Sequence, residues 1–418
     1  MPPDSRRLRF VYFLVAGSGL VNVARAMSLS FLAVKLQQSF GLGPAAIGVL
    51  LGTGPLLGAI AAPVAGSLSD RVGRQFMLVL MLVLTALSLV GMGFAQSVTA
   101  FCAAQIVAAV SIAVYEPISR ALMSDICPPE LRLKYFSWRY MAVNAGWAVG
   151  PLIGIAAGAA FGLLFTLAGC IYAAFALALH LVGVPADPKA SGSEAAEERV
   201  SVLASIRAAA RDPRLTFFVG GGTLLIAVYG QWSATLAPYL STTLEGGVDL
   251  FAYLLSINGL VVLVGNLFAR RLIEKVGALH AMVLGCILIL ASELGFLASS
   301  GFTGFALFMV LFTIGEILVV PSEYLLVDGI CNARNRGSYF GAHSFSTIGN
   351  FFGPALGGLM AGTFGGAGMF LTFAAFAAAS AVMFTIGTRM PPPRPRTQGA
   401  PAVAAIEVSG LSSRLRYA

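Results

Sequence analysis

Long apolar runs separated by short polar stretches occupy almost the whole of this 418-residue chain. They constrain the fold more than any other feature, because a helix that crosses a bilayer needs about 20 consecutive apolar residues. Hydrophobic residues make up 58% of the sequence and charged residues 11%, which gives more apolar surface than a water-soluble domain buries. The sequence therefore predicts an all-α membrane protein with twelve transmembrane helices, at residues 10–36, 44–66, 76–96, 99–124, 135–158, 161–184, 215–240, 249–270, 278–299, 303–328, 338–362 and 366–389.

The basic residues gather on one side of these expected helices. Of the 26 lysines and arginines, all but Arg25, Lys35, Arg120 and Arg139 fall in the termini or in alternate loops. Cytoplasmic loops of membrane proteins carry an excess of Lys and Arg, so we expect both termini in the cytoplasm and the chain in the cell inner (cytoplasmic) membrane. The net charge of +8 therefore reflects orientation in the membrane rather than binding to nucleic acid.

The second half of the chain repeats the first. A displacement of 204 residues aligns Asp-Arg-Val-Gly at 70–73 with Glu-Lys-Val-Gly at 274–277, and also aligns Pro117 with Pro321. A duplicated set of six spans predicts two pseudo-symmetric six-helix bundles. The expected parts are an N-terminal bundle at 1–184, a cytoplasmic linker with an amphipathic helix at 185–214, a C-terminal bundle at 215–390 and a disordered tail at 391–418.

The loop after the second expected helix has the sequence Gly-Ser-Leu-Ser-Asp-Arg-Val-Gly-Arg-Gln at residues 66–75. It follows the pattern Gly-x-Leu-x-Asp-Arg-x-Gly-Arg-Lys/Arg at every position except the last. The chain thereby resembles the major facilitator superfamily of transporters. The resemblance implies a cytoplasmic latch that holds the two halves together when the transporter is open outwards, while a purely topogenic role for the charges is the alternative. The expected latch residues are Gly66, Asp70, Arg71, Gly73 and Arg74, with Glu274 in the degenerate second copy.

Charged side chains inside membrane spans are costly, so each is a functional candidate. Glu116 and Arg120 lie one helical turn apart in the fourth expected helix. With Asp125, its repeat equivalent Asp328, and Arg139, we expect them to form a charge relay behind the latch rather than a substrate site. The arginine usual in this helix of the family is missing, and Gln105 stands near its place.

Arg25 lies about halfway along the first expected helix, which the resemblance places on the wall of the central cavity. We expect it to contact an anionic part of the substrate, and a structural ion pair with a carboxylate from another helix is the alternative. The other residues expected to line the cavity are Asn22, Arg139, Tyr229, Gln231, Trp232 and Asn258.

The tenth expected helix carries two glutamates, Glu316 and Glu323, seven residues apart and hence on one face. This stretch is similar to the corresponding part of drug/proton antiporters of the LmrP and MdtH type. We expect Glu316 to bind the coupling proton, with Glu323 as its helper. A permanent ion pair between Glu316 and Arg25 is the alternative.

Glycine and proline recur together in the fifth and eleventh expected helices, at Gly150-Pro151 and Gly353-Pro354. Small residues let helices approach closely, and proline permits a bend. We therefore expect hinge or packing roles in a moving transporter. The version in the fifth expected helix resembles a motif of exporters in the family, which favours efflux. Generic packing of membrane helices is the alternative.

No nucleotide-binding loop, nucleophile triad or metal cluster is apparent, which indicates a non-enzyme that needs no cofactor and uses a proton gradient. The expected function is secondary-active, proton-coupled export of small amphiphilic or drug-like molecules by alternating access. Export of a specific zwitterionic or anionic metabolite, chelator or lipid is the runner-up, followed by proton-coupled import, and then by a sensor or membrane enzyme. The expected partners are a small-molecule substrate, protons and membrane lipids, with no nucleic acid, and the chain is expected to be a monomer.

Overall fold

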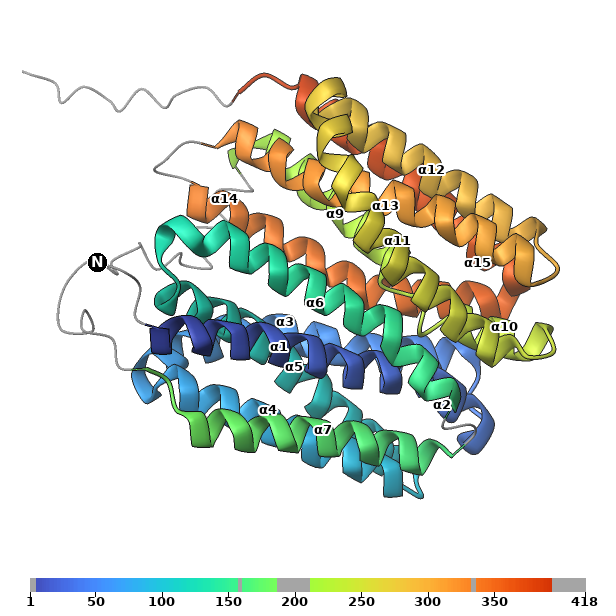
Figure 1. Cartoon of the computed structure of the whole chain (residues 1–418). Coiled ribbons are helices and arrows are strands. Elements are labelled where there is room, and N and C mark those ends of the chain that lie inside the picture. The colour runs from blue at the N-terminus through green and yellow to red at the C-terminus, as the bar shows by residue number, and fades with distance from the viewer. Residues whose placement is uncertain (1–4, 157–159, 186–210, 332–335, 393–418) are drawn as a thin grey trace, which may run out of the picture.

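The computed structural model describes residues 5–156, 160–185, 211–331 and 336–392, which are helical with short connections and contain no strand. The expected amphipathic helix of the linker and the expected disordered tail from residue 393 lie outside this part of the chain. Two groups of helices are stacked, with the N-terminal group (blue to green) below the C-terminal group (yellow to red) in Figure 1. The N-terminal half contains α1 (Ser5–Leu29), α2 (Leu32–Phe40), α3 (Pro44–Val72), α4 (Arg74–Phe94), α5 (Val98–Ile126), α6 (Pro129–Ala156) and α7 (Phe161–Val182).

The C-terminal half has the corresponding elements in the same order. They are α9 (Pro213–Tyr229), α10 (Leu236–Thr243), α11 (Gly247–Val276), α12 (Ala278–Ala298), α13 (Phe302–Ile330), α14 (Arg336–His343), the 3₁₀ turn η1 (Ser344–Ile348) and α15 (Gly349–Arg389). Within the described ranges, nine helical segments are long and apolar enough to cross a membrane by length and composition. Adding α6 and the pair α9 and α10, and dividing α15 at its kink, accounts for the twelve expected spans. The kink lies at Gly365, whose φ of 64° is accessible to glycine at little cost.

The first span of each half is broken in its second half, so that a long helix is followed by a short one. The break between α1 and α2 lies at Ser30 and Phe31, and the break between α9 and α10 lies at residues 230–235, so the two correspond under the sequence repeat. Near the first break, the hydroxyls of Ser28 and Ser30 donate to carbonyl oxygens one turn earlier, which loosens the helix locally. The breaks place side chains such as Trp232 at the interface between the halves.

Each half has its own apolar core, which positions the faces that meet between them. Phe101, Phe165 and Tyr172 are buried in the N-terminal half. Phe218, Phe312 and Phe384 are buried in the C-terminal half. Because most of the core is inside one half or the other, the halves can shift relative to each other while their own packing is kept.

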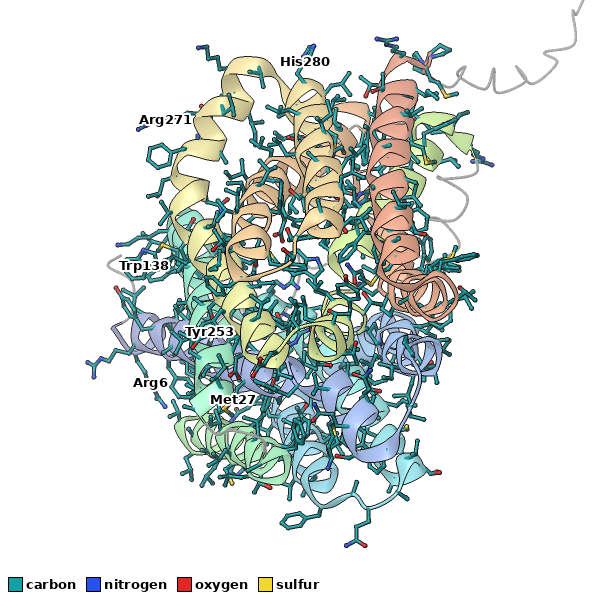
Figure 2. All side chains as sticks on the ribbon, turned by 90° about the vertical axis from the view of Figure 1, so that its right-hand side faces the viewer. Arg6, Met27, Trp138, Tyr253, Arg271 and His280 are labelled. Atoms are coloured by element: carbon teal, nitrogen blue, oxygen red, sulfur yellow. The ribbon has the colours of Figure 1, made fainter. Side chains whose placement is uncertain are left out.

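The two halves meet tightly at one end of the molecule, which we call the sealed end. There α3 and α15 touch through glycine, because a Cβ at Gly48 would overlap the carbonyl oxygen of Pro354. In α11, a Cβ at Gly259 would lie 2.7 Å from the backbone nitrogen of Ala148 in α6. The hydroxyl of Ser241 in α10 donates to Oε1 of Gln37 in α2 at 3.0 Å. Figure 2 looks onto this end, with the two halves one above the other.

The opposite end, at which α1, α6 and α9 begin and α3, α5 and α11 end, is called the basic end. Most described lysines and arginines of the termini and loops lie there, including Arg74, Arg132, Arg211, Arg214 and Arg271. This gathering agrees with the charge asymmetry read from the sequence.

The glycine and proline pairs of α6 and α15 pack within each half. A Cβ at Gly150 would lie 2.6 Å from the carbonyl oxygen of Val23 in α1, and a Cβ at Gly353 would overlap that of Ala227 in α9. Pro151 and Pro354 lie inside these helices. The pairs therefore allow the close approach of α6 to α1 and of α15 to α9.

Candidate functional site: a cavity between the two halves

A large cavity of about 2150 Å³ lies between the two halves. Its wall is formed by residues of α1 to α7 on one side, and by residues of α9, α11, α13, α14, η1 and α15 on the other. It extends from Leu32 and Pro354 near the sealed end to Gly66, Arg120 and Tyr324 towards the basic end. The cavity therefore runs between the halves from the sealed end towards the basic end.

Arg25 of α1 lies on the cavity wall, as the sequence predicts. Its guanidinium lies over the ring of Trp147 in α6, with 5.8 Å between the guanidinium carbon and the ring centroid. Its Nε is buried without a hydrogen-bond partner, and no described carboxylate forms an ion pair with it. The expected alternative of a structural pair with Glu316 is therefore not the arrangement that the structure shows.

Three more buried polar atoms without a hydrogen-bond partner belong to residues on the same wall: Oε1 of Gln105, the hydroxyl of Tyr172 and Nε1 of Trp232. Buried polar groups in proteins are nearly always paired, so an unpaired set on a cavity wall indicates a place for a ligand or water. Gln105 stands at the position where the family pattern led us to look for an arginine. Tyr172 is missed by sequence reasoning, because a tyrosine in an apolar helix has no pattern that distinguishes a cavity residue from a core residue.

The two glutamates on the wall already have protein partners. Glu116 of α5 accepts a hydrogen bond from Arg139 of α6 at 2.9 Å, and Nη2 of Arg120 lies 3.9 Å from the same oxygen. Glu316 of α13 accepts from Nδ2 of Asn258 in α11 at 2.8 Å. Glu316 thus has a neutral amide as its partner, whereas Glu116 is paired with a cation.

Glu323 lies off the cavity wall, although the sequence places it on the same helical face as Glu316. Its side chain points into the C-terminal half, where Oε1 lies 2.8 Å from Nε2 of His343, and both residues are buried. Gly222 of α9 makes room for this carboxylate, because a Cβ there would overlap Oε1 of Glu323. His343 ends α14 just where the 3₁₀ turn η1 begins, and no sequence pattern connects it to a residue twenty positions earlier.

The other expected cavity residues divide into two groups. Tyr229, Trp232 and Asn258 line the cavity. Asn22, Gln231 and Arg139 do not, because their polar groups are buried against neighbouring helix atoms. Asn22 donates to the carbonyl oxygen of Ser18, Gln231 is hydrogen-bonded to Thr235, and Arg139 donates to Ser119 and Glu116.

The structure describes some of the residues of the expected latch. Arg74 at the start of α4 forms an ion pair with Asp125 near the end of α5, which ties two helices of the N-terminal half together. Gly73 joins α3 to α4 with a φ of 97°, which favours glycine. The side chains of Asp70 and Arg71 lie outside the described part. In the second copy, Glu274 pairs with the exposed Arg270 one turn earlier in the same helix, and Asp328 lies in the last turn of α13.

Gln75, the position at which the loop departs from the family pattern, has a structural role. Its Nε2 donates to the carbonyl oxygen of Leu179 at 3.1 Å, and its Oε1 accepts from the backbone nitrogen of Val184 at 3.1 Å. The amide therefore bonds a carbonyl and an N–H group at the end of α7, which a basic side chain, having only donors, does not match.

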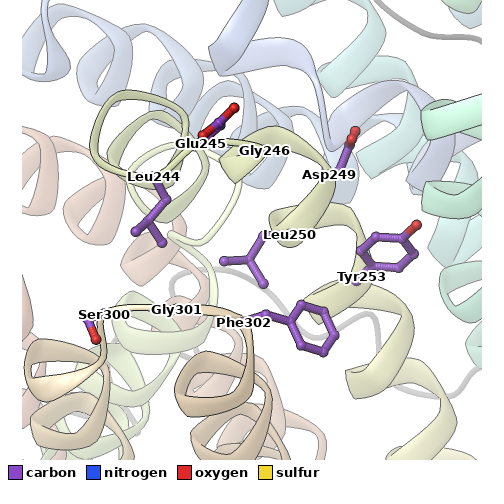
Figure 3. A pocket seen from close by; sticks show the side chains of 9 residues that line it. All are labelled: Leu244, Glu245, Gly246, Asp249, Leu250, Tyr253, Ser300, Gly301 and Phe302. Carbon is purple, nitrogen blue, oxygen red and sulfur yellow. The ribbon is translucent and has the colours of Figure 1, made fainter.

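A second, smaller pocket of about 390 Å³ lies at the sealed end (Figure 3). Glu245 and Asp249 stand on one side of it, and the rings of Tyr253 and Phe302 meet edge to face with 6.1 Å between their centroids. All its lining residues belong to the C-terminal half, so it is not on the path between the halves.

Comparison with known proteins agrees with this architecture. A family model described as Major Facilitator Superfamily matches residues 14–347. The chain is 28% identical over 84% of its length to the uncharacterized MFS-type transporter YqjV of Bacillus subtilis, of which it covers 86%. It is 23% identical over 83% of its length to the multidrug resistance protein MdtH of Shigella boydii, of which it covers 84%. A crystal structure of a bacterial homologue of the lysosomal transporter Spinster, inward-facing and unoccupied, superposes with a TM-score of 0.75 at 16% identity, covering 92% of this chain and 98% of that one.

Proposed function

The chain belongs to the Major Facilitator Superfamily of transporters, and we propose that it is a proton-coupled exporter of small amphiphilic molecules that works by alternating access. The observation that carries the proposal is the cavity between the halves, closed at the sealed end, with Glu316 on its wall. A transporter of this kind moves its solute by exchanging which end of the cavity is closed.

Glu316 is the group that we assign to proton binding. An ion-paired carboxylate resists protonation, but Glu316 has only the amide of Asn258 as its described hydrogen-bond partner. Because Glu316 faces the cavity, its proton and a bound substrate influence each other directly. Coupling then follows if the protonated and ionised forms favour different states of the two halves.

The pair of Glu323 and His343 is the second part of the proposed coupling. It joins α13 to the end of α14 by a single buried hydrogen bond of 2.8 Å. This hydrogen bond lies at the point where α14 passes into the 3₁₀ turn. Short 3₁₀ segments within a helix often mark hinges, which supports a role for this pair in movement of α14.

The direction of transport is proposed from charge. If the basic end faces the cytoplasm, as the excess of Lys and Arg predicts, the cavity is open to the inside of the cell. A solute would then enter from the cytoplasm, and protons returning inwards would drive its release outside. The similarity to MdtH, named a multidrug resistance protein, favours export over the alternative of proton-coupled import.

The test is transport of two small amphiphiles, the anion 1-naphthoate and the cation ethidium, by the full chain in proteoliposomes with an imposed pH gradient, and gradient-driven transport of either one supports the proposal. We expect accumulation driven by the gradient, and we expect Glu316→Gln to reduce the rate at least tenfold because the coupling proton has lost its site. Glu245→Gln, at the small pocket of the sealed end, is the matched control and should keep the wild-type rate. Full pH-driven flux in Glu316→Gln would remove the coupling assignment. Absence of pH-driven flux of any solute tried would favour a sensor over a transporter.

A further inference from the structure

Three buried hydrogen-bond donors without a partner line the cavity: Nε of Arg25, the hydroxyl of Tyr172 and Nε1 of Trp232. From them we infer that the substrate is an amphiphilic organic acid, with an aromatic or alicyclic body, whose anionic group binds at Arg25. The inference rests on the proposed function, because it assigns a substrate class to the cavity of the transporter.

The first argument is the charge of the cavity wall. A guanidinium in a membrane-embedded cavity is costly without a counter-ion. Arg25 has none among the described residues, since Glu116 is engaged with Arg139 and Glu316 with Asn258. An anionic substrate supplies the missing charge, whereas a cationic one would add to the repulsion.

The second argument is the arrangement of donors around Arg25. Tyr172 of α7 is 1% exposed and interacts electrostatically with Arg25 of α1, so the two helices present a cation and a hydroxyl in the same region. Trp232 adds an N–H group from the C-terminal half, at the break between α9 and α10. Carboxylates, sulfonates and phosphates accept from such donors, and hydrogen bonds between charged partners are the strongest that side chains form.

The third argument concerns the body of the substrate. Trp147 lies under the guanidinium of Arg25 and also lines the cavity, so a flat apolar group next to the acid would meet an aromatic surface. Leu29, Leu32 and Phe165 continue that surface on the N-terminal half. The unpaired acceptor Oε1 of Gln105 suits a hydroxyl or N–H group on the same molecule.

The experiment compares an acid with its uncharged analogue on the full chain in lipid nanodiscs. Binding of tritiated 1-naphthoate and 1-naphthamide is measured by scintillation proximity, with empty nanodiscs subtracted. We expect naphthoate to bind at least tenfold more tightly. Arg25→Gln should lower naphthoate affinity at least tenfold while changing naphthamide affinity less than twofold, since a charge-assisted bond contributes in that range. Tyr172→Phe should weaken naphthoate binding about threefold or more.

Two variants serve as controls. Lys35→Gln removes a cation that stacks on Phe40 and Phe161 away from the cavity, and it should leave both affinities unchanged. Arg25→Lys keeps the charge and should keep a preference for the acid, which separates loss of recognition from loss of folding if Arg25→Gln aggregates.

Equal affinity of the wild type for the acid and the amide would overturn the inference, as would tighter binding of 1-naphthylmethylammonium or no binding of naphthoate at millimolar concentration. An equal loss of affinity for 1-naphthoate and 1-naphthamide in Arg25→Gln would also contradict the inference. Failure of this inference is distinguishable from failure of the proposed function. Flux driven by the pH gradient without a preference for the acid would support the transport function and contradict the anion site. Binding specific for the acid without flux would support the anion site and contradict the transport function.

Discussion

At the residue scale, polar groups without a charged partner distinguish the candidate site in the cavity from the paired charges around it. Arg25 and Glu316 both line the cavity, and neither has an oppositely charged partner among the described side chains. By contrast, Glu116 and Arg139 neutralise each other, and Arg139 is 4% exposed. An ion pair between buried groups is stable but unavailable to a ligand, which explains why the expected cavity role of Arg139 is not the one that the structure supports.

A prediction at this scale concerns His343. Replacement by alanine leaves the carboxylate of Glu323 buried without its imidazole partner, which costs about 1 to 3 kcal/mol. We expect His343→Ala to lower the thermal unfolding midpoint in detergent and to change the pH dependence of transport. Glu245→Gln, at the exposed small pocket of the sealed end, is the control. An unchanged midpoint together with an unchanged pH profile would show that the pair contributes neither stability nor coupling.

At the element scale, the start of α9 is fixed by a compact polar cluster. Asp212 caps the helix by accepting from the backbone nitrogen of Arg214, and it also bonds the Arg214 side chain and the hydroxyl of Tyr339 in α14. Burial acts to raise the pKa of Asp212, but the hydrogen bonds from Arg214 and Tyr339 outweigh it and hold the pKa below its ordinary value. The cluster therefore joins the start of α9 to α14 most strongly when Asp212 is ionised.

The sign of the resulting pH dependence is testable. Because the folded pKa of Asp212 is lowered, its stabilisation is present above the unfolded pKa of about 3.9 and is lost as the pH falls through the folded pKa. We expect Asp212→Asn, which can still cap the helix, to reduce stability at pH 7 by about 1 to 3 kcal/mol and to flatten the loss on acidification. Thermal unfolding in detergent between pH 3 and pH 7 measures both the stability at pH 7 and its loss on acidification. The variant Asp249→Asn, at an exposed position, is the control. A variant as acid-sensitive as the wild type would contradict the assignment.

The helices can be predicted closely from the sequence, because inside the bilayer each span must form all its backbone hydrogen bonds within itself. The predicted runs correspond to the described helices, and the repeat of 204 residues is visible in the matching breaks at Ser30 and residues 230–235. The breaks were not predicted, since serine and glycine are common in unbroken membrane helices as well.

At the scale of the whole molecule, the sealed end joins the two halves at one end of the cavity. Its contacts join α2 to α10, α3 to α15 and α6 to α11, one pair through the hydrogen bond from Ser241 to Gln37. Alternating access requires these contacts to separate while the halves close at the basic end.

Linking the sealed end should therefore stop transport without stopping binding. In a chain with cysteines at Gln37 and Ser241, a short bis-methanethiosulfonate reagent is expected to reduce pH-driven flux at least tenfold. Binding of 1-naphthoate should remain, because the cavity stays accessible from the basic end, and a reducing agent should restore flux. The single variant Gln37→Cys with the same reagent is the control. Full flux in the linked double variant would show that the sealed end does not open during transport.

The sequence by itself determined the membrane fold, the two related halves and the side on which the basic residues gather, and it singled out Arg25 and Glu316 as candidates, both of which line the cavity. These depend on composition and spacing along the chain, which the bilayer converts directly into helices. Only the tertiary structure decided which polar groups have partners. It paired Glu323 with His343, buried Asn22, Gln231 and Arg139 away from the cavity, and placed Tyr172 on its wall. Those outcomes depend on how the helices are rotated and packed against each other. Two residues on one helical face have different surroundings when a neighbouring helix covers one of them and leaves the other open to the cavity.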